Sequence, residues 1–283
     1  MLALDVDGTL LDGQGRLTER VREAVRMARR SGLEVCLVSN RRPRSMAGLA
    51  QALELTCPLV AFNGGLVVDP ATLRPLRSVT MPREVVGDTM RMWNGEDLSV
   101  FAYRLVYKGE PDIFYTRHPD WPQSAAYIAA AGANAARLSS PADLDWEPLR
   151  VVVRDGEEAV RGARRLAEPR LDLERVRVHH FRDYNGTWHY QVDPHGATKT
   201  AGLQYVCQHL GFSAAEVVAV GDHLNDLDLL EFAGLGVAMG NAQPELKRRA
   251  DVVIGDHDRH GLAQFIEDLV AGRLAGGGAG GEA

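Results

Sequence analysis

The stretch DVDGTL, residues 5–10, begins at the end of the short, mainly apolar run Leu2–Val6, which predicts a buried β-strand. Alternate residues of a strand face the same side, so Asp5 and Asp7 are expected to project together. Gly8 allows a sharp turn directly after them. Two carboxylates this close repel each other unless a proton or a cation lies between them. The stretch therefore predicts either a cation-dependent site at a strand end or, taken alone, an acidic turn.

A second acidic cluster, GDHLND at residues 221–226, follows another predicted strand, Val217–Val220. The carboxyl ends of parallel strands meet at one edge of a sheet, where such folds bind ligands. The carboxylates of both clusters are then expected around one point, and their members are Asp5, Asp7, Asp222 and Asp226. Ligands that are all oxygen favour a hard cation, with Mg²⁺ the first choice. The alternative is a helix N-terminus that carries aspartates only for dipole reasons.

Three polar residues elsewhere are candidates for binding a phosphate at the same edge. Ser39 and Asn40 follow the predicted strand Leu33–Val38, and a hydroxyl, an amide and backbone N–H groups there suit an anion. Lys199 stands near the start of a predicted helix, where its ammonium can neutralise a phosphate and a carboxylate. Taken singly, these residues are equally compatible with an ordinary turn and a solvated surface lysine.

Strands and helices alternate at both ends of the chain, which predicts a parallel sheet with crossover helices. Thr18 is placed to cap the first helix, and Pro43 to open the second. The expected strands are Leu2–Val6, Leu33–Val38, Leu59–Phe62, Val217–Val220, Leu235–Met239 and Asp251–Ile254; the expected later helices are Ala197–Leu210, Leu227–Phe232, Pro244–Ala250 and Gly261–Val270.

The middle of the chain differs in composition, because residues 82–190 contain all four tryptophans. Strand-like runs at Val100–Tyr107, Leu149–Arg154 and Val176–Arg182 are mixed with helical stretches, and Asn185-Gly186 is a hairpin signal. We therefore predict an α/β fold with a discontinuous, doubly wound core at 1–80 and 191–272 and a smaller α/β domain inserted at 81–190. The Gly/Ala-rich segment 273–283 is expected to be a disordered tail.

Composition excludes several classes of protein. The formal charge of −6 gives no basic surface for nucleic acid. No apolar run approaches the ~18 residues that a membrane span requires, and the N-terminus has no features of a secretory signal. Three cysteines, odd in number and widely separated, argue against a disulfide framework. We expect a cytoplasmic protein that is a monomer or a small homo-oligomer, without a membrane or nucleic-acid partner.

Taken together and in this order, the motifs closely resemble those of the haloacid dehalogenase superfamily of phosphohydrolases. The resemblance extends to its Cof-like subfamily and covers residues 1–80 and 190–270. AFNGG at residues 61–65 looks like the asparagine-glycine segment of that subfamily. GVAMGNA at residues 236–242, followed by Lys247 and Asp251, looks like its C-terminal signature, and Asp258 to Gly261 like the step that opens its last helix.

The resemblance implies a Mg²⁺-dependent phosphatase that hydrolyses a small phosphorylated metabolite, by default a sugar phosphate. Asp5 would be the nucleophile and Asp7 the general acid and base. The metal ligands would be Asp5, Asp7 through its carbonyl, and Asp222, with Asp226 in support. Phosphate and substrate contacts would come from Ser39, Asn40, Lys199 and Asn225.

The chain departs from the family pattern at two positions. Asn40 stands where the family usually has glycine, which puts phosphate contacts by this residue in doubt, and Thr200 stands where glycine commonly follows the lysine. A phosphomutase or phosphotransferase, and a non-catalytic binding protein of the same fold, remain as alternatives.

Overall fold

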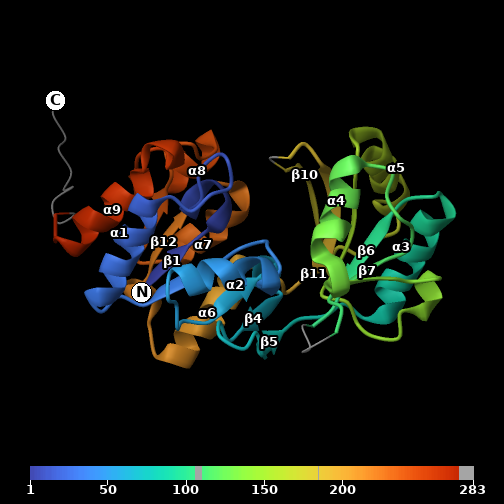
Figure 1. Ribbon diagram of the computed structural model, residues 1–283, viewed down its shortest axis with the longest axis horizontal. Helices are drawn as coiled ribbons and strands as arrows, with labels where there is room; N and C mark the ends of the chain where they lie inside the picture. Colours follow the sequence, from blue (N-terminus) through green and yellow to red (C-terminus); the bar gives the residue numbers. More distant parts are fainter. Residues whose placement is uncertain (106–109, 184, 274–283) are drawn as a thin grey trace. The chain divides into compact units, whose positions relative to one another are not determined.

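The computed structural model describes residues 1–105, 110–183 and 185–273, which form two compact units (Figure 1). The first, here called the core unit, comprises Met1–Ala61, Asp69–Thr72 and the chain from Lys199 onward. The second, the inserted unit, comprises Phe62–Val68 and Leu73–Thr198. The predicted α/β class, with a parallel-sheet core and an additional sheet, is confirmed.

The sheet of the core unit has five strands in the order β14-β13-β12-β1-β2, and every neighbouring pair is parallel. Strand β3, Leu59–Ala61, continues it through a bridge between Val38 and Val60. The residues of β1 and β2 are buried throughout, as expected of a parallel sheet covered on both faces. The bounds are Leu2–Leu4 for β1, Val35–Leu37 for β2, Val218–Gly221 for β12, Leu235–Ala238 for β13 and Val252–Val253 for β14.

Helices connect these parallel strands and pack in two groups. Helix α1, Glu19–Arg30, packs against α9, Gly261–Val270, whereas α6, Lys199–Leu210, packs against α7, Leu227–Phe232 (Figure 1). The N-cap predicted for α1 is confirmed, because the Val21 N–H donates to Oγ1 of Thr18 at 3.4 Å. The remaining helices are α2, Pro43–Ala52, which begins at the predicted proline, and α8, Pro244–Arg249.

The inserted unit has a six-stranded sheet in the order β10-β11-β9-β6-β7-β8, antiparallel except for the parallel pair β7/β8. The predicted hairpin is confirmed, since Arg182 pairs with Trp188 across the turn and Gly186 has a φ of +83°. The bounds are Val100–Tyr103 for β6, Ile113–Tyr115 for β7, Ala135–Arg137 for β8, Arg150–Asp155 for β9, Val176–Arg182 for β10 and Trp188–Pro194 for β11.

Helices α3, Arg83–Gly95, and α5, Glu157–Ala167, cover one face of this sheet. Their apolar side chains form a core with alternate strand residues such as Val151, Val153 and Tyr190. By the alternation of strand side chains, the residues between these face the other side of the sheet. Helix α4, Pro122–Ala131, lies against β9. Strand β4, Leu66–Val68, pairs antiparallel with β5, Pro75–Ser78, in a three-stranded sheet of order β3-β4-β5.

The division into units differs in detail from the predicted domain boundaries at residues 80/81 and 190/191. Strand β11 runs unbroken to Pro194 and is hydrogen-bonded to β10 and β9, so a boundary at 190 would cut through a strand. Of the predicted tail, residues 274–283 lie outside the described part of the chain, as do residues 106 and 107 of the strand-like run predicted at Val100–Tyr107.

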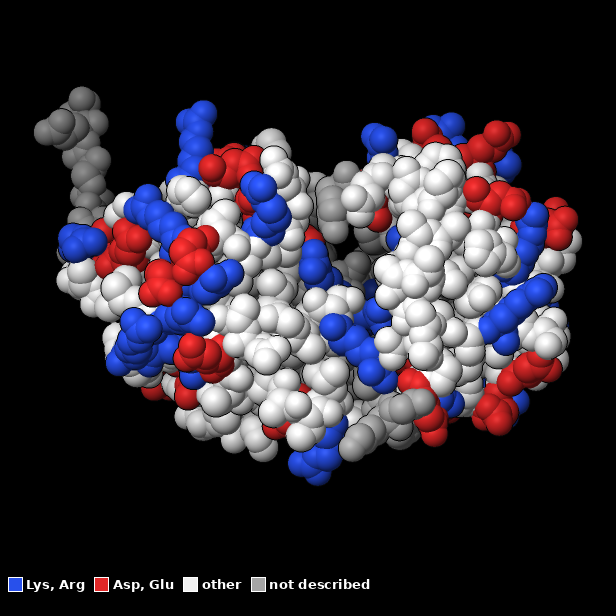
Figure 2. Space-filling model, in the orientation of Figure 1, with Lys and Arg blue, Asp and Glu red and all other residues white. Residues whose placement is uncertain are grey.

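On the face of each unit that Figure 2 shows, positive and negative side chains lie next to one another. Many form ion pairs one helical turn apart, such as Arg22 with Glu19 and Arg161 with Glu157. Among the described residues, no helix is both long and apolar enough to cross a bilayer. The three cysteines are buried and carry free thiols.

Candidate active site

Asp5 lies at the carboxyl end of β1, which is flanked by β12 and β2 in the sheet. Its backbone N–H donates to the carbonyl of Val220 at 3.0 Å, which fixes it beside the end of β12. The acidic loop that contains Asp222 begins there, and Ser39 follows the end of β2. The parallel order therefore brings these three residues to one edge of the sheet, as the sequence predicted.

A lysine and three carboxylates form the centre of this edge. The Nζ of Lys199 donates to Oδ1 of Asp5 and to Oδ1 of Asp226, both at 2.6 Å. The carboxylates of Asp5, Asp222 and Asp226 offer oxygens that all lie within 4.8 Å of one another. Lys199 is 4% exposed and Asp226 fully buried, so this lysine is not a solvated surface residue.

Two glycines make room for this cluster. Gly8 has a φ of +79°, a conformation that suits glycine, and a Cβ at this position would collide with the carboxylate of Asp222. A Cβ at Gly221 would likewise collide with the carboxylate of Asp226. The second carboxylate oxygen of Asp226 accepts from the backbone N–H groups of Asp222 and His223, at 3.1 and 3.0 Å. Its position is therefore fixed by the loop itself and by Lys199.

Burial and the neighbouring negative charges raise the pKa values of Asp5 and Asp222. Burial raises the pKa of Asp5 well above its ordinary range, and the charges of Asp226 and Asp222 add to this against the opposing effect of Lys199. Burial and the Asp226 charge raise the pKa of Asp222 to about 6. Burial by itself would lower the pKa of Lys199, but the two carboxylates that it contacts outweigh this and raise it. The cluster is thus an electrostatically unfavourable arrangement that a bound cation would relieve.

The donor set fits a divalent metal ion. Three buried carboxylates and one ammonium leave a net formal charge of −2, and every anionic ligand atom is oxygen. Hard divalent cations prefer such ligands. The residues present are therefore suited to a divalent metal.

Asp7 does not join this cluster, contrary to the expectation that the two carboxylates of the first motif project together. Strand β1 ends at Leu4, and residues 6–10 curl into a tight turn closed by a hydrogen bond from the Leu11 N–H to the Val6 carbonyl at 3.0 Å. Strand alternation therefore does not apply to these positions. The carboxylate of Asp7 is 41% exposed and accepts two hydrogen bonds from the guanidinium of Arg41.

The other predicted phosphate ligands have different surroundings. Ser39 is 1% exposed, and its Oγ accepts from the backbone N–H of Arg41 at 3.1 Å, so the hydroxyl shapes the loop after β2. Asn40 lies in the same loop and is partly exposed. Asn225 belongs to the single turn η6, Leu224–Asp226, next to Asp226.

Two residues that sequence reasoning did not assign to the site support it. Arg41 holds Asp7, as described above. Asn241 donates from Nδ2 to the carbonyl of Gly8 at 2.8 Å and accepts at Oδ1 from the N–H of His257 at 3.1 Å. It therefore links the turn at residues 6–10 to the segment before α9. Its position within GVAMGNA at residues 236–242 is the only sequence signal that marks it.

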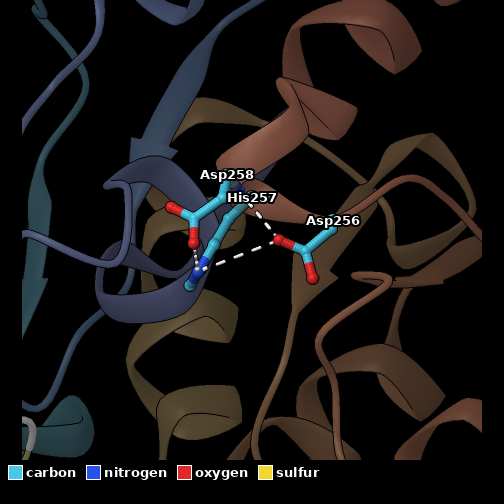
Figure 3. A group of neighbouring side chains, drawn as sticks. All are labelled: Asp256, His257 and Asp258. Atoms are coloured by element: carbon cyan, nitrogen blue, oxygen red, sulfur yellow. Dashed lines mark hydrogen bonds and ion pairs between the residues drawn. The ribbon is translucent and has the colours of Figure 1, made fainter.

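A second group of neighbouring ligand atoms, Asp256, His257 and Asp258, lies in the turn before α9 (Figure 3). The carboxylate of Asp258 accepts from the N–H of Gly13 at 2.8 Å, and that of Asp256 accepts from the N–H of Asp258 at 2.9 Å. These hydrogen bonds give the two carboxylates a structural role: they close the turn and attach it to the loop after residue 12.

Comparison with known proteins identifies the family. A sequence model of the haloacid dehalogenase-like hydrolases matches residues 2–266. The chain belongs to this family. The family predicted from the motifs is thereby confirmed, and the fold agrees with it.

Several of the named relatives are phosphatases. The pyridoxal phosphate phosphatase YbhA of Escherichia coli is 30% identical over 94% of this chain and 97% of its own length. The 5-amino-6-(5-phospho-D-ribitylamino)uracil phosphatase YitU of Bacillus subtilis is 28% identical over 95% of this chain and 96% of its own. A haloacid dehalogenase-like hydrolase from Bacteroides thetaiotaomicron has a similar structure, with a TM-score of 0.78, 25% identity and coverage of 95% of this chain and 98% of that one. The predicted enzyme class, a phosphatase, agrees with these names.

Proposed function

We propose that this enzyme is a Mg²⁺-dependent phosphatase that hydrolyses a small phosphorylated metabolite through a phosphorylated Asp5. The observation that carries the proposal is the buried contact of Asp5 with Lys199 beside the carboxylates of Asp222 and Asp226, in a chain of the haloacid dehalogenase-like hydrolases. Asp5 in that position contacts the ammonium of Lys199 and lies beside two carboxylates that could hold a metal ion.

In the first step, an oxygen of the Asp5 carboxylate attacks phosphorus and the bond from phosphorus to the ester oxygen breaks. Asp7 donates its proton to the departing alcohol. In the second step, Asp7 accepts a proton from water as the water oxygen attacks phosphorus. The acyl-phosphate bond to Asp5 breaks, which releases inorganic phosphate and restores the Asp5 carboxylate and the protonated Asp7.

The roles of the remaining residues follow from charge and position. Lys199, Ser39, Asn40 and Asn225 would bind phosphoryl oxygens or the substrate. Asp5, Asp222 and the backbone carbonyl of Asp7 would hold Mg²⁺, and Asp226 would support it. When bound, the metal would offset negative charge on the phosphoryl oxygens during in-line transfer.

The substrate class rests on the relatives. Their named substrates are phosphate monoesters of a pyridoxal ring and of a ribityl chain, which extends the default expectation of a sugar phosphate to ring compounds. We propose a cytoplasmic metabolite of this size, without nucleic-acid or membrane partners. If the phosphoryl group passed to a second alcohol and not to water, the enzyme would be a phosphomutase.

The proposal is tested by measuring phosphate release from p-nitrophenyl phosphate, pyridoxal 5′-phosphate and a panel of sugar phosphates, with Mg²⁺ and with a chelator. Asp5→Asn removes the nucleophile with little change in size, and turnover should be lost. Asp88→Asn, which neutralises an exposed carboxylate on α3, is the matched control and should keep full turnover.

Acid-quenched mass spectrometry of the peptide that contains Asp5 should reveal a phosphoryl adduct in the wild type and none in Asp5→Asn. Turnover that survives in Asp5→Asn would overturn the assignment of the nucleophile. Conversion of a sugar monophosphate to its isomer without phosphate release would replace hydrolysis by mutase activity.

A further inference from the structure

Arg154, on β9 of the inserted unit, is a buried arginine without an acidic partner among the described residues. It is 8% exposed, and its side chain makes no hydrogen bond or ion pair with any residue that the structure describes. Its Nε is shielded from solvent and has no partner. The guanidinium lies over the ring of Tyr127, 3.8 Å from the ring centroid, and 5.9 Å from that of Phe101.

Arg150 on the same strand shows how this sheet otherwise accommodates a buried arginine. Its Nε and Nη2 donate to the two carboxylate oxygens of Asp193, at 2.6 and 2.8 Å. Gln191 donates to the same carboxylate at 2.7 Å. The two arginines stand four residues apart on β9 and therefore face the same side of the sheet. Among the described residues, Arg150 has a carboxylate as hydrogen-bond partner and Arg154 does not.

The acidic groups close to Arg154 are already engaged elsewhere. Asp183, whose charge interacts with Arg154, accepts hydrogen bonds from the backbone N–H groups of Asn185 and Thr187 and contacts Nε2 of His189 at 3.0 Å. Asp155, the next residue on the strand, accepts from the N–H of Gly156 at 2.7 Å. Burial lowers the pKa of His189, and the charge of Arg154 lowers it further against the effect of Asp183. The positive charge of Arg154 therefore acts on both Asp183 and His189, although neither forms an ion pair with it.

A buried guanidinium that makes no hydrogen bond or ion pair with a carboxylate is costly in free energy, so its presence requires an explanation. The contact with the π-face of the Tyr127 ring offsets part of this cost, because the ring attracts the guanidinium cation. Stacking leaves the N–H groups at the edge of the plane directed sideways, and this edge matches the two oxygens of a carboxylate or phosphate. Aromatic rings thus lie against the guanidinium of Arg154, while its Nε has no hydrogen-bond partner among the described residues.

We propose that Arg154 is the anion-binding residue of a ligand subsite on the inserted unit, which accepts a carboxylate or phosphate group. The oxyanion can come from two sources: a second acidic group on the phosphorylated substrate, or a separate small anion. The first case rests on the proposed phosphatase function, whereas the second does not.

Binding at Arg154 is measured directly with ¹⁵N-arginine-labelled protein, without Mg²⁺. The Nε–H resonance of Arg154 is assigned by its loss in Arg154→Met, and sulfate and then malonate are titrated. The proposal expects a saturable shift of this resonance that exceeds the shift of Arg182, an exposed arginine on β10 of the same sheet. A shift no larger than that of Arg182 with both anions overturns the proposal.

The source of the anion is decided by two matched substrates, phenyl phosphate and 4-carboxyphenyl phosphate. If the oxyanion belongs to the substrate, Arg154→Met lowers kcat/KM for the carboxylated compound at least tenfold relative to phenyl phosphate, and Arg182→Met does not change this ratio. An unchanged ratio together with a saturable shift assigns the subsite to a separate anion. Absence of turnover with both substrates in the wild type would contradict the proposed function but leave the binding measurement intact.

Thermal unfolding separates a ligand-binding role from a structural one. Methionine is similar in length and carries no charge, so Arg154→Met removes the uncompensated cation and should leave Tm unchanged or higher. A marked fall in Tm, with no saturable shift in the wild type, would make the stack on Tyr127 purely structural and overturn the proposal. Arg154→Lys keeps the charge but loses the planar edge, and should bind sulfate more weakly than the wild type when binding is measured by calorimetry.

Discussion

Asp7 accepts two hydrogen bonds from one guanidinium: Nε of Arg41 lies 2.8 Å from Oδ2, and Nη2 lies 2.6 Å from Oδ1. The contact joins the turn after β1 to the loop after β2. Because a bidentate pair fixes both the distance and the plane of a carboxylate, Arg41 restricts the orientation of the residue proposed as general acid and base.

We predict that Arg41→Gln lowers turnover by about 10- to 100-fold, because general acid–base catalysis contributes about 10²–10⁴-fold and depends on positioning. An alkyl phosphate, whose alcohol must be protonated to leave, should lose more than p-nitrophenyl phosphate, whose leaving group needs no proton. Steady-state kinetics with both substrates measures this difference. Arg30→Gln, an exposed position at the end of α1, is the control. An equal loss with both substrates would show that Arg41 acts elsewhere than on Asp7.

Replacing Gly8 should damage both the fold and the cation site. In Gly8→Ala the backbone must hold an alanine at positive φ, at a cost of about 1–3 kcal/mol, and its methyl group must displace the carboxylate of Asp222. Mg²⁺ affinity, measured by calorimetry, should fall along with the free energy of unfolding.

The matched control is Gly48→Ala, in the middle of α2 with no heavy atom within 4 Å of the added Cβ. It should stabilise the protein by about 0.5–1 kcal/mol, because alanine is the better helix former. If the two substitutions had the same effect on Mg²⁺ binding, the close approach of Gly8 to Asp222 would not matter for the site.

The buried pair of Arg150 and Asp193 should be sensitive to the loss of one partner. Asp193 is fully buried, so Asp193→Asn leaves an uncompensated guanidinium, and we expect the free energy of unfolding to fall by about 3–5 kcal/mol. Denaturant titration followed by tryptophan fluorescence measures the loss. Glu157→Gln, which breaks an exposed pair with Arg161 on the neighbouring α5, should cost less than about 1 kcal/mol. Similar losses for the two variants would contradict the distinction between buried and exposed pairs.

The stability of the inserted unit should depend on the protonation of His189. Burial lowers the pKa of this imidazole in the folded state below the ordinary value near 6.5, so the unfolded chain binds the proton more tightly. Its contribution to stability is therefore fully present above about pH 6.5 and is lost as the pH falls from there through the lower pKa of the folded state.

Urea unfolding is measured at a series of pH values from about 7.5 to about 5, a range that includes the ordinary histidine pKa of about 6.5. As the pH falls, His189→Gln should lose less stability than the wild type. The exposed His209 on α6 provides the control substitution, His209→Gln, which should keep the wild-type slope. A wild-type slope in His189→Gln would show that this histidine titrates alike in the folded and unfolded states.

Local sequence patterns determined much of the fold, because they depend on neighbours in the chain. Thr18 caps α1, Pro43 opens α2, and the Asn185-Gly186 turn joins β10 to β11, since capping, a fixed φ and a tight turn each need only a few adjacent residues. The motif order also sufficed to identify the family. Asp5 and Asp222 were assigned to one edge correctly because parallel strand ends must meet there.

Only the tertiary structure decided how individual side chains are used. The end of β1 at Leu4 invalidated the alternation argument for Asp7, because a strand's last residue depends on which backbone groups its neighbours can pair. Lys199 was indistinguishable from a surface lysine until Asp5 and Asp226, distant in sequence, were seen to contact it. Arg150 and Arg154 look alike on one strand, and their difference arises entirely from Asp193. Partners of buried charges are chosen across the fold, and no local pattern records that choice.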